Sequence, residues 1–130
     1  MRVLLDTHVW LWLQVSPQRL HAEALEMARD AANELLLSAA SAWEIAIKYA
    51  LGRLALPQPP ATYVPQRMGS SGVTTLAVEQ RHALHVATLP SLHRDPFDRL
   101  LVAQAQLESI PIVTGDPNIG RYDVSVIAAR

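Results

Sequence analysis

Four acidic residues stand at places where an α/β fold can gather side chains into one crevice: Asp6, Glu44, Asp98 and Asp116. Asp6 directly follows the apolar run at residues 3–5, which is typical of a strand covered on both faces. Ligands of open α/β sheets bind outside the carboxyl ends of the strands. A carboxylate there needs a cation, a hydrogen-bond donor or a metal as its partner. The alternative is that Asp6 simply caps a helix starting near His8.

Glu44 and Asp98 each have a structural explanation beside the functional one. Glu44 lies among apolar neighbours in an expected helix, where a partly buried, unpaired carboxylate is unfavourable. The alternative is an i,i+4 ion pair with Lys48 on a solvent-facing helix. Asp95 is expected to cap a helix whose first residue is Pro96, and Asp98 then resembles the acid of a capping box. A first-turn acid can also face a cation across the crevice.

Asp116 follows another apolar run, and the sequence at 116–118 is by itself a turn signal. If both strands are parallel, however, Asp6 and Asp116 meet at one edge of the sheet and repel each other unless a cation lies between them. Mg²⁺ and Mn²⁺ favour carboxylate and water oxygens. The histidines show no tight metal-binding spacing except His82 and His85, which we expect on an exposed helix face. The sequence therefore predicts an oxygen-only metal site.

The segments between these acids alternate between strand-like and helix-like patterns. The expected strands are 3–5, 35–37, 73–76, 111–114 and 124–127, and the expected helices are 8–14, 18–33, 39–51, 60–68, 77–87 and 96–109. Ser16 is expected as an N-cap before Pro17, Gly52 ends a helix, and 69–72 reads as a break. This order predicts an α/β, three-layer sandwich around a mainly parallel sheet, in a single domain over 1–130.

The composition narrows the classes of protein. Half of the residues are hydrophobic and 18% are charged, which is an ordinary globular balance, and no cysteine is present for disulfides, thiolate sites or a cysteine nucleophile. Neither a signal peptide nor a membrane-spanning run is visible, so we expect a soluble, cytoplasmic protein with no membrane partner. Apart from the four acids above, eight acids face eleven lysines and arginines. An acidic pocket in an otherwise mildly basic protein suits a polyanionic substrate.

Two further features concern surfaces. The segment 8–14 carries Trp10 and Trp12 and offers more hydrophobic surface than a small core obviously needs, so we expect part of it to pack against another chain. The alternative is that both indoles are buried in their own domain. Arg94 and Arg99 flank Asp98 and suit phosphate contacts or internal ion pairs equally well.

Taken in order, five motifs resemble the PIN-domain toxins of the VapC type. They are DTH at 6–8, SAWEIAIK at 41–48, LGRL at 51–54, HRDPFDRLLVAQA at 93–105 and TGD at 114–116. The resemblance implies a PIN-like fold and a Mg²⁺-dependent endoribonuclease, the toxin of a type II toxin–antitoxin system. It also implies that the protein cleaves tRNA or rRNA and inhibits translation and growth. The implied partners are a second copy in a homodimer and a cognate VapB-type antitoxin whose tail blocks the active site in a hetero-oligomer.

Carried over residue by residue, the resemblance makes Asp6, Glu44, Asp98 and Asp116 the catalytic and metal-binding carboxylates, with Mn²⁺ a plausible substitute for Mg²⁺. Some members have a further acid where this chain has Asn118, so the number of metals stays open. Bound Mg²⁺ would activate a water for in-line attack, and no protein nucleophile is needed. The alternative function is a catalytically inactive PIN-like module that binds RNA or protein.

Overall fold

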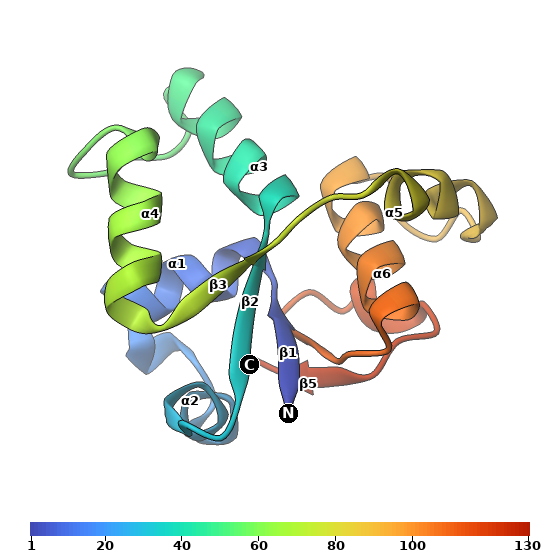
Figure 1. Cartoon of the computed structure of the whole chain (residues 1–130), viewed down its shortest axis with the longest axis horizontal. Helices are drawn as coiled ribbons and strands as arrows, with labels where there is room; N and C mark the ends of the chain where they lie inside the picture. Colours follow the sequence, from blue (N-terminus) through green and yellow to red (C-terminus); the bar gives the residue numbers. More distant parts are fainter.

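A five-stranded sheet forms the centre of the computed structural model, which describes residues 1–130 (Figure 1). Its strands are β1 (Arg2–Leu5), β2 (Glu34–Ser38), β3 (Val73–Leu76), β4 (Ile112–Thr114) and β5 (Val126–Ala128). Their spatial order is β3-β2-β1-β4-β5, and every neighbouring pair is parallel. The predicted fold class is confirmed, and the sheet is entirely rather than mainly parallel.

Side chains on the central strands alternate between two apolar clusters. Val3 and Leu5 of β1 point into one cluster, and Leu4 points into the other. Successive residues of a strand face opposite sides of the sheet, so a continuous apolar run is buried only where helices cover both sides. The run at 3–5 was therefore a sound indicator of a central strand.

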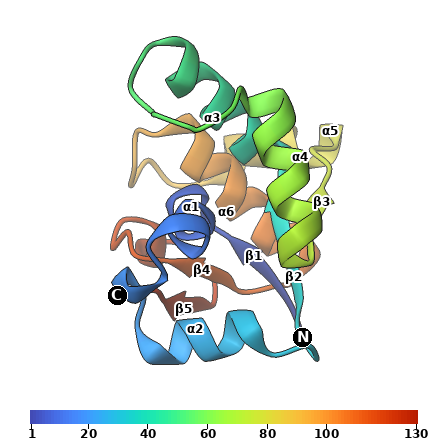
Figure 2. The ribbon, with the colours of Figure 1, turned by 90° about the vertical axis from the view of Figure 1, so that its left-hand side faces the viewer.

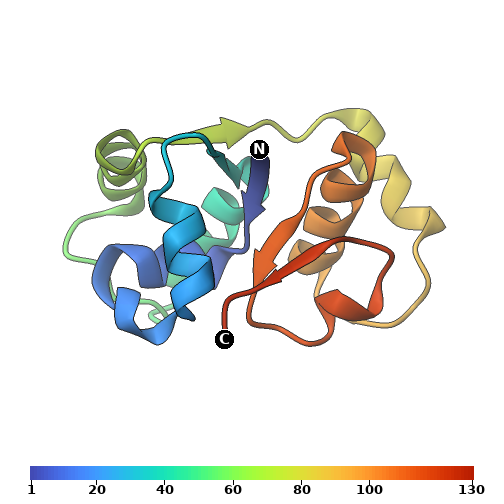
Figure 3. The ribbon, with the colours of Figure 1, turned by 90° about the horizontal axis from the view of Figure 1, so that it is seen from below.

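Helices supply both covering layers. They are α1 (Thr7–Val15), α2 (Ala22–Arg29), α3 (Ala39–Ala50), α4 (Pro60–Ser71), α5 (Gln80–His85) and α6 (Pro96–Glu108), with short 3-10 turns at Pro17–Arg19, Val86–Thr88 and Ile119–Arg121. Helices α1, α2 and α4 lie on one side of the sheet and α5 and α6 on the other (Figures 1 and 3). Helix α3 continues beyond the carboxyl end of β2 and contacts α1, α4 and α6 (Figure 2). None of these helices combines the length and the apolar character needed to cross a membrane.

The strand order creates a switch point beside β1. From β1 the chain builds β2 and β3 on one side and later adds β4 and β5 on the other. At such a point the connections leave the sheet in opposite directions and open a crevice at the carboxyl ends of the strands. Asp6 follows β1 directly, and Asp116 comes two residues after β4. The topology thus brings the first and last of the predicted acids to one edge.

Two helix signals are confirmed. Asp95 caps α6, because its Oδ1 accepts from the backbone N–H groups of Phe97 and Asp98 at 2.8 and 3.2 Å. Gly52 follows α3 with a φ of +74°, as a residue past a helix end does. The cap on α6 matters for the site, since it fixes the first turn on which Asp98 lies.

The predicted helix over 18–33 is wrong as a single element. The chain instead forms a 3-10 turn and then α2, separated by Leu20 and His21. The N–H of His21 donates to the carbonyl oxygen of Ala129 at 2.8 Å, so a contact with the end of the chain replaces helix continuation. Ser16 makes no side-chain capping bond at the turn.

The predicted break at 69–72 is also wrong, because α4 continues to Ser71. The hydroxyls of Ser70 and Ser71 donate to the carbonyl oxygen of Arg67. Because these hydrogen bonds lie within the helix, the two serines do not stabilise a competing turn. Gly72 ends the helix with a φ of +70°, a left-handed conformation that glycine adopts without a Cβ clash.

Two further boundaries shift, and one predicted exposure is reversed. The helix expected over 77–87 is α5, which begins only at Gln80. Its start is fixed by a capping box, in which the N–H of Glu79 donates to Nδ1 of His82 at 3.0 Å. His82, expected on an exposed face, is therefore fully buried. The strand expected over 124–127 starts later, since the N–H of Val124 still donates within the preceding turn.

The expectation of surplus apolar surface on α1 is wrong for Trp10, which is fully buried in its own core. Trp12 is half-buried beneath the guanidinium groups of Arg19 and Arg130. The exposed indole is instead that of Trp43 on α3, which keeps 60% of its surface. Association with another chain stays a prediction, and α3 offers the apolar surface for it.

The left-handed backbone conformation of Ser109 can be tested by substitution. This residue ends α6 with a φ of +54° and is the one non-glycine residue with positive φ. Because the left-handed conformation costs an L-residue roughly 1 kcal/mol, we expect Ser109→Gly to raise the free energy of unfolding by about 0.5 kcal/mol in urea denaturation. Ser70→Gly, inside α4, is the matched control and should lower it. An equal decrease in the free energy of unfolding of both variants would contradict the left-handed conformation of Ser109.

Candidate active site

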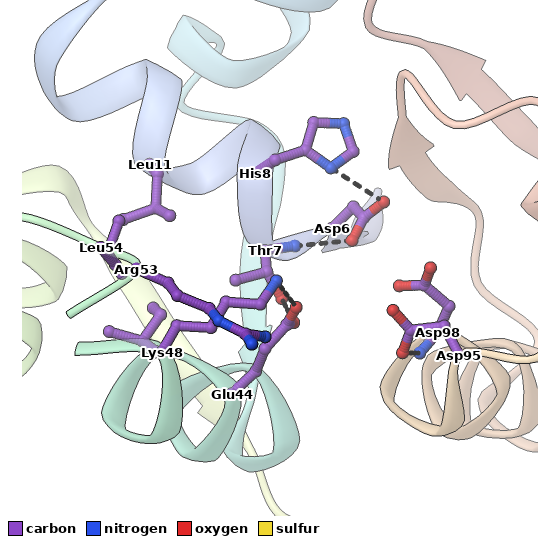
Figure 4. A pocket seen from close by; sticks show the side chains of 11 residues that line it. Asp6, Thr7, His8, Leu11, Glu44, Lys48, Arg53, Leu54, Asp95 and Asp98 are labelled. Atoms are coloured by element: carbon purple, nitrogen blue, oxygen red, sulfur yellow. Dashed lines mark hydrogen bonds and ion pairs between the residues drawn. The ribbon is translucent and has the colours of Figure 1, made fainter. Parts of the chain in front are cut away.

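Asp6 lies at the carboxyl end of β1 with only 2% of its surface exposed (Figure 4). Its Oδ1 accepts from the backbone N–H of Thr7 at 2.7 Å, so it does cap α1. Its Oδ2 accepts from the hydroxyl of Thr114 at 2.7 Å and lies 3.3 Å from Nδ1 of His8. The capping role and a role in the crevice are therefore compatible, because each uses a different oxygen.

His8 connects the two central strand ends. Its Nε2 accepts from the backbone N–H of Gly115 at 3.1 Å, just past β4. In the neutral ring the proton is then on Nδ1, on the side of Asp6. The side chain of His8 thus fixes both the Asp6 carboxylate and the loop that leads to Asp116.

Glu44 forms the i,i+4 ion pair of its structural interpretation, but its carboxylate is buried and does not face solvent. It is 95% buried on α3, and its Oε1 accepts from the hydroxyl of Thr7 at 2.8 Å. Its Oε2 lies 2.5 Å from Nζ of Lys48, one turn further along the helix. The charge of Glu44 is therefore balanced within the chain by a half-exposed lysine.

Asp98 and Asp116 meet at His93. Nε2 of His93 lies 2.8 Å from Oδ2 of Asp98 and 3.5 Å from Oδ2 of Asp116, and one ligand atom from each of the three residues falls within 4.8 Å of the others. The N–H of Asp116 also donates to Oγ1 of Thr114 at 3.0 Å, and this threonine is the one that holds Asp6. The three aspartates are thus linked through two side chains.

Sequence reasoning missed His93. It stands in a loop, two residues before the cap of α6, where a side chain can fold back over the first helical turn, but nothing in the sequence shows which acids it reaches. Two arginines hold this loop. Arg99 donates to the carbonyl oxygen of Pro90 at 2.9 Å, and Arg121 donates to that of Leu92 at 3.0 Å. Arg99 therefore forms internal hydrogen bonds to carbonyl oxygens and not the internal ion pair that was one of its two interpretations.

A cavity of about 320 Å³ opens between these elements (Figure 4). Asp6, Glu44 and Asp98 stand around it, and Asp95 joins them from the helix cap. The remaining lining residues are Thr7, His8, Leu11, Ile45, Lys48, Arg53 and Leu54. Asp116 does not line this cavity and is joined to it through its contact with His93. The structure thus brings together three predicted acids directly and the fourth at the cavity's edge.

Burial and the nearby charges raise the pKa values of two of these acids. Burial raises the pKa of Asp6, while the nearby His8 and the hydrogen bond from Thr114 oppose that shift. Burial, followed by repulsion from Asp6, raises the pKa of Asp98 to about 7, although the hydrogen bond to His93 lowers it. Burial is the main cause of both shifts, and repulsion between the acids adds to it.

These residues fit a divalent metal. The acidic cluster of Asp98, Asp116 and His93 offers two carboxylates and one imidazole nitrogen, with Asp6 adjacent, and the chain has no thiolate. Hard cations such as Mg²⁺ and Mn²⁺ favour such oxygen-rich ligand sets. A cation would also relieve the repulsion that raises the pKa of Asp98. Glu44 is less available, because Lys48 already neutralises it.

A second group of potential metal ligands, Glu79, His82 and Glu108, lies away from this cavity. Nδ1 of His82 accepts from the backbone, so the proton of the neutral ring is on Nε2, which lies 3.4 Å from Glu108 but makes no hydrogen bond to it. Arg81 lies between the two glutamates, at 3.0 and 3.1 Å from their oxygens. The guanidinium of Arg81 therefore already balances these carboxylates, and the group is a poorer fit to a metal than the acidic cavity.

The fold and the site together define a parallel α/β protein with an acidic, metal-compatible cavity at the switch point of its sheet. The family model described as PIN domain matches residues 3–125, and the chain belongs to the PIN-domain family. It is 35% identical over 115 residues to Ribonuclease VapC22 of Mycobacterium tuberculosis, a match that covers 88% of this chain and 86% of that protein. The predicted resemblance to the VapC type is confirmed.

Two more comparisons agree. Over 71 residues the chain is 51% identical to Ribonuclease VapC16 of Mycobacterium tuberculosis, which covers 52% of this chain and 50% of the relative, so the match spans half of that protein's length. A crystal structure of VapBC2 from Rickettsia felis, bound to a DNA fragment from its promoter, aligns over 100% of both chains with a TM-score of 0.75 and 14% identity. At that identity the likeness shows the shared fold.

The raised pKa of Asp98 predicts a pH dependence of stability. Its pKa of about 7 in the folded protein exceeds the ordinary aspartate value of 3.8, so its contribution to stability is complete below about pH 4 and is lost as the pH rises through 7. We expect the melting temperature of the metal-free protein to fall by several degrees more between about pH 5 and about pH 8 than that of Asp98→Asn. Parallel pH profiles for the two proteins would contradict the shift.

Proposed function

We propose that this protein is a Mg²⁺-dependent endoribonuclease and the toxin of a type II toxin–antitoxin system, with Mn²⁺ as a working substitute. The observation that carries the proposal is the convergence of Asp6, Asp98 and Asp116 at the switch point, with a pKa near 7 for Asp98. Two relatives named as ribonucleases support RNA as the substrate.

Each side chain has a distinct part in this proposal. Asp6, Asp98 and Asp116 hold the metal, and His93 and Thr114 fix the spacing between them. When bound, Mg²⁺ supplies an activated water for in-line attack and stabilises the leaving oxygen. Glu44, the fourth proposed catalytic carboxylate, closes the cavity wall. Its pairing with Lys48 makes it the weakest candidate for a direct bond to the metal.

The substrate and partners follow from the family and the charge pattern. We propose tRNA or rRNA as the target, with arrest of translation and growth as the consequence. The positive excess outside the four acids favours a polyanion of this kind. A VapB-type antitoxin is proposed as partner because the structural neighbour from Rickettsia felis is a VapBC complex. A homodimer is proposed as well, with the exposed Trp43 and Leu51 as candidate contact residues.

Asp6→Asn separates catalysis from folding. Asparagine caps a helix about as well as aspartate and removes one charge from the crowded site. We expect the variant to stay folded, with unchanged or slightly higher stability, and to lose cleavage of RNA by orders of magnitude in Mg²⁺. It should also fail to arrest growth when expressed without an antitoxin.

The matched control for this variant is Asp123→Asn, which removes an exposed carboxylate that makes no side-chain hydrogen bond or ion pair. It should cleave RNA at the wild-type rate, and EDTA should stop both it and the wild type. A folded Asp6→Asn protein that cleaves at the wild-type rate would falsify the mechanism. Wild-type protein that binds RNA but never cuts it would support the inactive binding module instead.

The metal-binding roles can be ranked by calorimetric titration with Mn²⁺. Asp98→Asn and Asp116→Asn should each weaken the affinity at least about tenfold, because each removes a proposed ligand. Glu44→Gln should weaken it less, since Lys48 already balances that carboxylate. If Glu44→Gln weakens Mn²⁺ binding as much as Asp98→Asn does, Glu44 belongs among the direct ligands.

A further inference from the structure

A second cavity, of about 340 Å³, adjoins the acidic one. It is lined by His8, Trp12, Gly115, Asp116, Pro117 and Arg130. His8 lines both cavities, and Asp116 belongs to the acidic cluster through its contact with His93. The second cavity is therefore a direct extension of the proposed active site.

The residues in the wall of this cavity pack closely against one another. His8 and Trp12 lie four residues apart on α1, so they share a side of the helix, and their rings meet edge to face at 4.9 Å. Gly115 approaches them from β4. A Cβ at Gly115 would lie 3.1 Å from Cγ of Arg130 and 3.2 Å from Nε2 of His8, closer than ordinary van der Waals contact. The absence of a side chain at Gly115 lets Arg130 lie against this wall.

The guanidinium groups of Arg19 and Arg130 both lie against the indole ring of Trp12. Cζ of Arg19 lies 4.7 Å and Cζ of Arg130 lies 5.1 Å from the ring centroid of Trp12. Neither side chain takes part in an ion pair or a side-chain hydrogen bond, so their N–H donors are free. Trp12 attracts each cation, but the two cations repel each other. An anion that accepts from both would relieve that repulsion, and the guanidinium fork matches a phosphate.

Arginines without ion-pair partners lie at both cavities. Arg53 lines the acidic cavity and Arg130 lines the adjoining one. Arg19 lies on the ring of Trp12, which also lines the adjoining cavity. A strand with regularly repeating phosphates fits this pattern, because one phosphate at the metal leaves its neighbours to the arginines.

We propose that Arg19 and Arg130, held on Trp12, bind a backbone phosphate of the RNA next to the phosphate that is cleaved. This proposal rests on the ribonuclease function proposed above and assigns the adjoining cavity to the same strand. Because the contact is to the backbone, it positions the RNA without reading its sequence. Arg19 and Arg130 are thus substrate-positioning residues that are distinct from the acids.

The test compares a double variant, Arg19→Gln with Arg130→Gln, against the matched control Arg29→Gln. Arg29 is also exposed and unpaired but lies on α2, away from both cavities. Binding of a short fluorescein-labelled single-stranded RNA is followed by anisotropy across a salt series, in an Asp6→Asn background so that the RNA is not cut. Cleavage kinetics are measured with the native Asp6.

We expect the double variant to bind the RNA about tenfold more weakly and to reduce the salt slope by about one to two. Its KM should rise while kcat stays near the wild-type value. Arg19→Lys with Arg130→Lys keeps both charges and should restore the salt slope, and Arg29→Gln should behave as the wild type.

The outcomes separate the two proposals. If the wild type cuts RNA and the double variant matches Arg29→Gln in affinity and salt slope, the phosphate site is wrong and the ribonuclease function stands. If the wild type neither binds nor cuts RNA, the proposed function fails first and this site fails with it. Loss of binding to a polyglutamate peptide, with RNA binding intact, would assign the arginines to an acidic protein partner and overturn the proposal.

Discussion

The burial of the Asp6 carboxylate is the constraint on which the rest of the site depends. A carboxylate with almost no exposed surface is unfavourable unless donors surround it. Here the donors come from different parts of the chain: the N–H of Thr7 from α1 and the hydroxyl of Thr114 from β4, with the ring of His8 nearby. Holding one charge therefore fixes β1, α1 and β4 against each other. The crevice at the switch point is a consequence of that arrangement.

Each of the remaining acids has a partner nearby, but the acids together still carry more negative charge than their partners balance. Lys48 serves Glu44, His93 serves Asp98 and Asp116, and backbone donors serve Asp95. These pairings stabilise the acids within the chain, but burial still raises the pKa values of Asp6 and Asp98. A divalent cation would reverse those shifts, because it favours the ionised form of every carboxylate that it contacts.

The order of strands and helices could be predicted from local patterns, because buried parallel strands and capped helices leave short-range signals. The apolar run at 3–5 and the Asp95 cap are examples. One error arose where a distant contact decides the structure, because the N–H of His21 reaches Ala129 and interrupts the expected helix. Others arose from local hydrogen bonds that the sequence pattern did not reveal, such as the capping box between Glu79 and His82. The four acids were found from strand ends and family motifs, whereas the place of His93 depends on how a loop folds back.

Arginines show most clearly why such a site cannot be ranked from sequence alone. Arg99 and Arg121 use their donors on carbonyl oxygens of the loop before α6, and by doing so they place His93. Arg19 and Arg130 have the same chemistry, but they lie on the ring of Trp12 and make no side-chain hydrogen bond or ion pair, so their donors stay free for a ligand. Whether an arginine builds the site or binds the substrate is thus decided by the acceptors that the fold places beside it. Those acceptors are brought there by residues far away in the chain.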